Sequence, residues 1–106
     1  MTITHRAFFG TEERNFTLTD PMIAELERLT ETGIGALFSR VVRSDFRLPD
    51  LVETIRLGLI GGGTNPQEAA QLVDTYAKHR PLGEILPLAL DILDARWSGK
   101  EVQAND

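Results

Sequence analysis

Apolar and polar residues alternate in two short runs within the first twenty positions of the chain. The first run places four residues on one face: Ile3, His5, Ala7 and Phe9. Residues 15–19 form the second run, and a polar connection of hairpin length, residues 10–14, separates the two. This pattern predicts an antiparallel β-hairpin over residues 3–19. Because two strands alone are marginally stable in water, we expect the hairpin to lie on helices or to pair with another strand.

From residue 20 onward, apolar positions recur three or four residues apart, which is the period of an amphipathic α-helix. Asp20 before Pro21, and Asn65 before Pro66, are typical of helix starts, since a capping side chain precedes a proline that needs no backbone donor. Gly33 is predicted to end the first helix in a left-handed conformation. The five predicted helices begin or run at about Asp20, Ile34, Pro49–Ile60, Pro66 and Leu82–Trp97.

The predicted fold class is mostly α, with one domain over residues 1–106. Glycines at positions 61–63 and 99 are expected to stop the third and fifth helices. The polar residues at the end of the chain are expected to fray. The parts in order are a β-hairpin over 3–19, a compact bundle of about five short helices over 20–99, and a frayed tail over 100–106.

The fifth helix is apolar around nearly its whole circumference, which is more apolar surface than one contact in a small domain covers easily. Two interpretations remain open: either the other helices wrap it, or part of it forms a binding surface. Both hold if its C-terminal half, residues 90–97, projects from the bundle. On the second interpretation the sequence predicts a protein-binding surface that includes Leu86, Leu90, Leu93 and Trp97.

Basic residues follow the second helix although the chain as a whole is acidic, with a net charge of −5. Arg40, Arg43 and Arg47 lie where positive charge favours the helix dipole. The alternative is a patch for an acidic partner, in which case Arg40 and Arg43 join the protein-binding surface. An acidic domain supplies few cations to phosphates, so we expect no nucleic-acid partner. Carboxylates at Glu68 and Asp74 also argue against a DNA-reading fourth helix.

The sequence contains no pattern typical of a catalytic, metal or cofactor site. Gly61–Thr64 follows a helix and precedes no lysine, so it fits a helix stop better than a phosphate loop. His5 and His79 are isolated, and Asp91 and Asp94 share a face that we expect to be solvated. We therefore predict no enzyme activity, no cofactor and no metal ligands. The absence of cysteine, of a long apolar run and of a secretion signal predicts a cytoplasmic protein without a membrane span.

The ordered set of features resembles a gene transfer agent and phage tail family, described both as a tail assembly chaperone and as a tail-tube-associated protein. The resemblance covers about residues 5–99. Its most specific parts are the segments ETGIGAL (Glu31–Leu37) and GLIGGGTNPQEA (Gly58–Ala69). This family has no catalytic signature, so the resemblance transfers no active-site residue.

The resemblance implies a tail assembly chaperone that binds the tape-measure protein, the tail-tube protein or both. Such a protein would shield a long, apolar, helical tape measure by helix-in-groove contacts. The alternative is a structural, tail-tube-associated component of the particle. A homo-oligomer is compatible with either, and a free edge of the N-terminal hairpin is a candidate for adding a strand to a tail-tube subunit.

Overall fold

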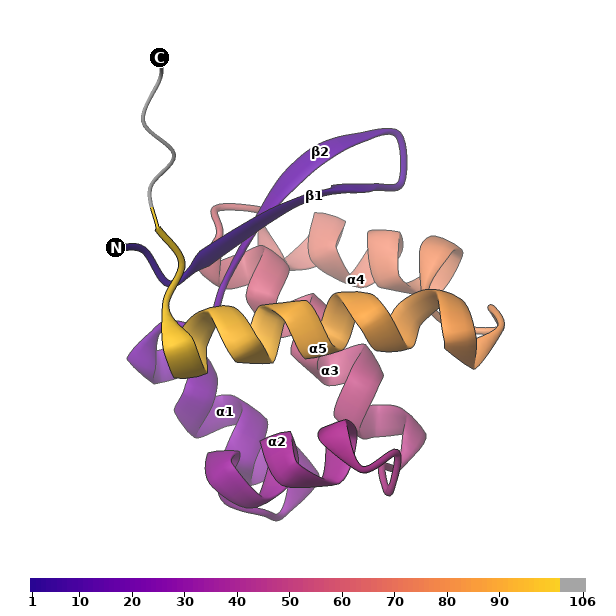
Figure 1. Cartoon of the computed structure of the whole chain (residues 1–106). Coiled ribbons are helices and arrows are strands. Elements are labelled where there is room, and N and C mark those ends of the chain that lie inside the picture. The colour runs from indigo at the N-terminus through magenta and orange to yellow at the C-terminus, as the bar shows by residue number, and fades with distance from the viewer. Residues whose placement is uncertain (102–106) are drawn as a thin grey trace.

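The computed structural model describes residues 1–101, and it confirms the predicted fold class: a β-hairpin followed by five α-helices (Figure 1). Residues 102–106, most of the tail that was predicted to fray, lie outside the described part of the chain. The elements in order are β1 (Thr4–Phe9), β2 (Glu12–Thr17), α1 (Asp20–Thr30), α2 (Ile34–Val42), α3 (Leu48–Gly61), α4 (Pro66–Tyr76) and α5 (Leu82–Ser98).

The hairpin turn is shorter than the sequence pattern predicted. The predicted loop over residues 10–14 is a two-residue turn at Gly10 and Thr11, and β2 already begins at Glu12. Gly10 has φ +76°, the conformation that a two-residue turn with glycine in first place requires to match the strand twist. Arg14, one of the polar residues after the turn, lies on β2 and donates to Glu68 of α4 at 3.0 Å.

The boundary between α1 and α2 also differs from the prediction. Thr19, and not Asp20, is the N-cap residue of α1, and its side chain makes no cap hydrogen bond. Glu31, and not Gly33, takes the left-handed conformation after α1, with φ 56°. Gly33 is instead the N-cap residue of α2, where the carboxylate of Glu27 accepts the backbone N–H of Ile34 at 2.8 Å.

Helix α3 lies at the centre of the molecule and packs against β2, α1, α4, α5 and α2. Its sequence is apolar on most of its circumference, so it can be buried on several sides at once. The core residues that are fully or almost fully buried include Phe16, Leu18, Leu26, Leu37, Leu51, Ile55, Leu59, Val73 and Ile92. Helix α5 is therefore not the centre of the bundle; it contacts α3, α2 and both strands, while its residues Leu82 and Trp97 stay exposed.

The glycines at the end of α3 permit a close approach of this helix to β2. A Cβ atom at Gly61 would lie 1.8 Å from the carbonyl oxygen of Thr17, and one at Gly62 would lie 1.9 Å from that of Asn15. No side chain fits at either position. The helix stop predicted at these glycines is present, since α3 ends at Gly61 and Asn65 caps α4 by accepting the N–H of Glu68.

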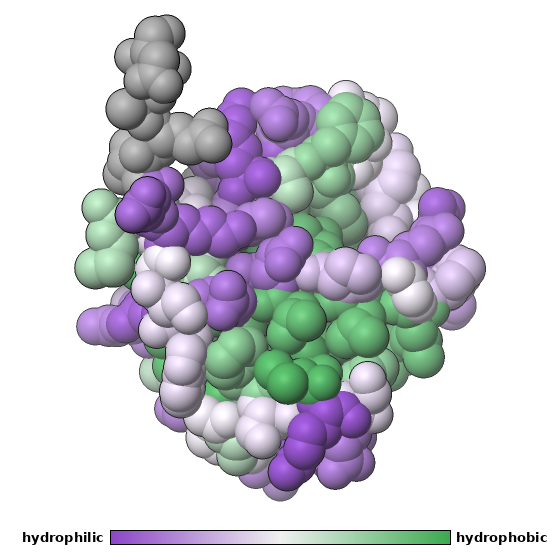
Figure 2. All heavy atoms as spheres, in the orientation of Figure 1, coloured by the Kyte–Doolittle hydropathy of each residue, from purple (hydrophilic) through white to green (hydrophobic). Residues whose placement is uncertain are grey.

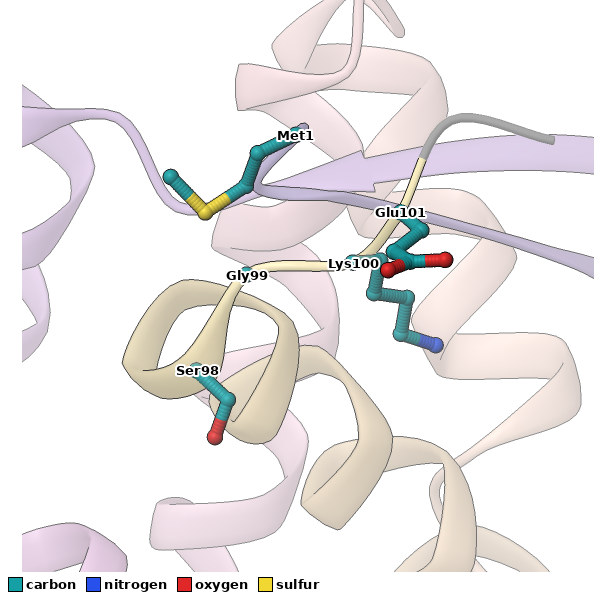
Figure 3. A pocket seen from close by; sticks show the side chains of 5 residues that line it. All are labelled: Met1, Ser98, Gly99, Lys100 and Glu101. Carbon is teal, nitrogen blue, oxygen red and sulfur yellow. The ribbon is translucent and has the colours of Figure 1, made fainter. Parts of the chain in front are cut away.

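The end of the fifth helix lies beside the start of the chain. Gly99 ends α5 with φ +73°, as predicted, but Lys100 is not frayed. Its backbone forms an antiparallel bridge with Thr2 through two N–H···O bonds of 2.7 Å. Figure 3 shows this region, where the side chain of Met1 lies over Gly99. An opening of about 550 Å³ is lined by Met1 and residues 98–101.

Helix α4 ends at Tyr76, and Lys78, His79 and Arg80 follow it in the connection to α5. His79 takes φ +64°, so the chain turns before Pro81 and α5 begins at Leu82. Within the described residues, no helix has both the length and the apolar character that crossing a membrane requires.

Candidate protein-binding face

Helix α5 has one buried and one open side, and the open side carries most of the predicted protein-binding residues. Leu93 is buried at 2% exposure, whereas Trp97 is 62% exposed. Leu86 and Leu90 lie between these extremes and are partly buried against the core. Spacing of three or four residues places all four on one stripe of the helix, together with Leu82, which is 48% exposed.

Helix α2 extends this stripe into a wider surface. The rings of Phe38 and Trp97 are in contact, with centroids 5.2 Å apart and planes inclined by 42°. Val42, one helical turn after Phe38, is 57% exposed. We call the surface formed by both helices the α2–α5 face; it comprises Ile34, Phe38, Val42, Leu82, Leu86, Leu90, Leu93 and Trp97.

The α2–α5 face contains a hollow of about 360 Å³ beside the indole ring. Its lining is mostly apolar and includes Ile23 of α1 in addition to residues of α2 and α5. Figure 2 shows apolar side chains gathered over the middle of this side of the molecule, with hydrophilic residues around them. An apolar surface that is hollowed and has a polar border is typical of a site for another protein chain.

Arg96 fixes the C-terminal end of the face in place. Its guanidinium donates to the carbonyl oxygen of Leu18 at 2.6 Å and to the carboxylate of Asp20 at 2.9 Å. These bonds tie the last turn of α5 to the start of α1. Trp97, the next residue, is therefore presented on a rigid element while most of its indole ring stays in solvent.

The two arginines of the predicted surface differ in their surroundings. Arg40 donates to both carboxylate oxygens of Asp50 at 2.8 Å, and Asp50 is 1% exposed. Arg40 therefore has a structural partner inside the chain. The side chain of Arg43 is 64% exposed, and the nearest carboxylate, that of Asp45, lies 3.9 Å away. Of the two, only Arg43 has its charge largely exposed.

A polar cluster lies on the opposite side of α5, where Lys100 contacts the Nδ1 atom of His5 and Asp91 lies 3.8 Å from its Nε2 atom. Burial lowers the pKa of His5 below its ordinary value, and the nearby Lys100 lowers it further, while Asp91 acts in the opposite direction. The imidazole is therefore mostly neutral near pH 7. In residues 1–101, no three potential metal-binding side chains are grouped closely enough to hold an ion.

Sequence reasoning identified the α5 stripe but missed its partners on α2. Phe38 and Val42 of α2 were not among the residues predicted to bind a partner. Their spacing from Ile34 predicts a shared helix face, but this spacing does not show whether another helix covers that face. The binding role of Leu86, Leu90, Leu93, Trp97, Arg40 and Arg43 stays a prediction.

The comparisons with known proteins give one family. A family model described as phage tail tube protein, GTA-gp10, matches residues 2–99, which include the hairpin and all five helices. No curated protein and no solved structure matches the chain significantly. The family description names a phage tail tube protein. With nearly the whole chain matched, this protein belongs to the phage tail tube protein, GTA-gp10 family.

Proposed function

We propose that the protein is a tail-tube-associated component of a gene transfer agent or a siphophage-like particle, and that it binds another tail protein through the α2–α5 face. The observation that carries the proposal is the open aromatic pair of Phe38 and Trp97 beside an apolar hollow. The family description, which names the tail tube, supports the structural role. Aromatic side chains of this kind are frequent binding hot spots.

Association with the tube is favoured over formation of its wall. Polymerising tube subunits are rich in β-structure, whereas residues 1–101 contain one sheet of two strands. The rest of the described chain is mainly helical, and the other helices pack around α3, so it has no further strands with which to form a tube wall. We therefore infer that the protein contacts tube subunits from the side or at an end.

A second candidate function is a tail assembly chaperone that binds the tape-measure protein. The observation that favours it is the hollow between α1, α2 and α5, which suits the apolar side of a helix. The net charge of −5 would add solubility to a complex with an apolar chain. A possible homo-oligomer is compatible with both candidates.

The two candidates differ in where the protein is found after assembly. Quantitative mass spectrometry of purified particles measures its copy number relative to the tube subunit. A constant copy number in finished particles supports the tail-tube-associated component. Presence in producing cells together with absence from particles supports the chaperone, and the tape measure should then stay in solution only when both proteins are co-expressed.

The binding face is tested by substituting its central aromatic residue. We expect Trp97→Ala to weaken binding to the purified tail-tube subunit at least about tenfold, because hot-spot residues contribute on this scale. Leu48→Ala is the matched control, since Leu48 is 51% exposed but lies at the start of α3, outside the α2–α5 face. Equal affinities of the two variants in a titration would contradict the proposed face.

A further inference from the structure

One edge of the two-stranded sheet has open backbone groups along β1. The two-residue turn makes Phe9 and Glu12 a hydrogen-bonded pair, so the odd-numbered residues of β1 bond to β2. The N–H and C=O groups of Arg6 and Phe8 therefore point away from β2. Within residues 1–101, these groups have no hydrogen-bond partner. Phe8 is also 68% exposed, and its side chain stands on the face of the hairpin opposite to that of the buried Phe9.

The opposite edge of the sheet is covered at Asn15 and Thr17. The outward carbonyl groups of Asn15 and Thr17 on β2 face the glycines at the end of α3, at distances that would exclude a Cβ atom. Unprotected strand edges promote unwanted pairing, and natural proteins usually cover or blunt them. In this protein the end of α3 packs tightly against the β2 edge, whereas the β1 edge stays accessible.

At the N-terminal end of the β1 edge, another segment of the same chain already pairs with it. The backbone N–H and C=O groups of Thr2 point to the same side as those of Arg6 and Phe8. They form two hydrogen bonds with the backbone of Lys100. Figure 3 shows the segment after Gly99 beside the start of the chain. In an antiparallel ladder the partner of Thr4 would be Ser98, which belongs to α5, so this pairing stops after one bridge. A third strand thus fits this side of β1, and the part along Arg6–Phe8 is free for another chain.

A groove of about 420 Å³ runs between β1 and the N-terminal half of α5. An added strand would have Pro87 and Leu88 of α5 on one side and Phe8 on the other. Asp91 also lines the groove, and its side chain is 56% exposed. The nearby His5 does not neutralise Asp91, because the imidazole is mostly neutral near pH 7. The other two charged residues of the groove, Arg80 and Glu84, form an ion pair with each other, with 3.0 Å between Nε and Oε2.

We propose that the open edge of β1 binds an extended segment of the tail-tube subunit, which adds a third strand along Arg6–Phe8 and places a basic side chain against Asp91. The identity of this partner rests on the proposed function. A second copy of the chain is a poorer occupant, because it would bring an equal groove with its own Asp91 and a net charge of −5.

Amide hydrogen exchange, measured by NMR on the ¹⁵N-labelled full chain, tests the pairing directly. In the free protein we expect fast exchange at Arg6 and Phe8 and slow exchange at Ala7, which bonds to β2. Adding the unassembled tail-tube subunit should slow Arg6 and Phe8 at least about tenfold. Exchange at Ala7 should change little. This alternation is specific for strand addition and requires no variant.

Two pairs of variants separate the backbone and charge contributions. Phe8→Pro removes the outward N–H without removing a β1–β2 hydrogen bond, and we expect a loss of affinity of at least about tenfold. Phe8→Ala keeps the N–H and should lose less than about threefold. Asp91→Asn should weaken binding several-fold at low salt. Its control is Asp94→Asn, since Asp94 is also exposed on α5 but does not line the groove.

The outcomes distinguish this inference from the proposed function. If the wild-type chain does not bind the tube subunit, both are overturned. If it binds while Arg6 and Phe8 still exchange fast and Phe8→Pro binds normally, only the strand addition is overturned. If Phe8→Pro abolishes self-association in sedimentation experiments without the subunit, the occupant is a second copy and the proposed partner is wrong. Circular dichroism of Phe8→Pro checks that the helices remain folded.

Discussion

Asp50 shows how one side chain connects three parts of the chain. It is 1% exposed, and its carboxylate accepts two hydrogen bonds from Arg40 of α2 and one from the backbone N–H of Arg47. A buried carboxylate is tolerated only when its oxygens are bonded in this way. Asp50 therefore holds the α2–α3 connection against the core and is not a candidate for chemistry.

Asp50→Asn leaves the guanidinium of Arg40 without its charged partner, and we expect a loss of about 3 kcal/mol in the free energy of unfolding. Denaturant titration followed by circular dichroism measures the change. Asp45→Asn is the control, because the Asp45 side chain is 77% exposed and its pairing with Arg43 is weak, so a change below about 0.5 kcal/mol is expected.

His5 predicts a pH dependence of stability. Its pKa is lower in the folded chain than in the unfolded chain, chiefly because of burial, so the unfolded chain binds a proton more readily. Stability is therefore expected to fall as the pH drops below about 6.5, the ordinary value for histidine. Thermal melts between pH 7.5 and 5.5 measure the effect. His5→Gln should have a flatter profile in this range, and an identical profile would contradict the assignment.

At the scale of elements, the end of α3 and the strand β2 are joined without any side chain between them. Gly61 and Gly62 place helix backbone directly against the carbonyl groups of β2. The contact positions the hairpin over the helices, and it also closes one edge of the sheet. The shape of the β1 edge, and with it the proposed strand addition, thus depends on two glycines of α3.

The close contact between α3 and β2 leaves no space for a side chain at Gly61 or Gly62. Gly61→Ala and Gly62→Ala each force backbone apart, and we expect losses of about 3 kcal/mol or more in the free energy of unfolding. Gly83→Ala is the matched control, since nothing lies within 4 Å of its Cβ position and it belongs to α5. There we expect a gain of up to about 1 kcal/mol from helix propensity. Chemical denaturation of the three variants measures these changes.

At the scale of the whole molecule, the fold keeps its largest aromatic side chain outside the core. Trp97 is 62% exposed and its ring contacts that of Phe38 on α2, so only a minor part of the side chain is buried in the fold. We expect Trp97→Ala to lower the free energy of unfolding by only about 1 kcal/mol, much less than its expected effect on binding. A large loss of stability would indicate that the residue serves the fold and not a partner.

Trp97 is the only tryptophan, so its fluorescence reports on the α2–α5 face alone. Covering the indole ring with a tail protein removes water from it, and we expect the emission to shift to shorter wavelength on binding. Titration of the chain with the tail-tube subunit measures the shift. The Leu48→Ala variant should show the same shift as the wild type. An unchanged emission spectrum during binding would place the contact elsewhere.

The sequence by itself determined the hairpin, the five helices and the starts and stops of most of them. These follow from local rules: the period of apolar residues, the cap at Asn65 and the glycine at position 99. Local rules were wrong at the turn after Phe9, which has two residues where a connection over residues 10–14 was predicted. At the end of α1, Glu31 took the left-handed conformation that was predicted for Gly33.

Only the tertiary structure decided which apolar surfaces are covered. The sequence shows that α3 and α5 are both apolar on most sides, but their order in the core depends on contacts between residues far apart in the chain. Placing α3 at the centre leaves the stripe of α5 with Leu90 and Trp97 partly open. The same packing gives Arg40 a buried partner and leaves the β1 edge open. Burial is a property of the assembled chain, and periodicity records only which side of each element can be buried.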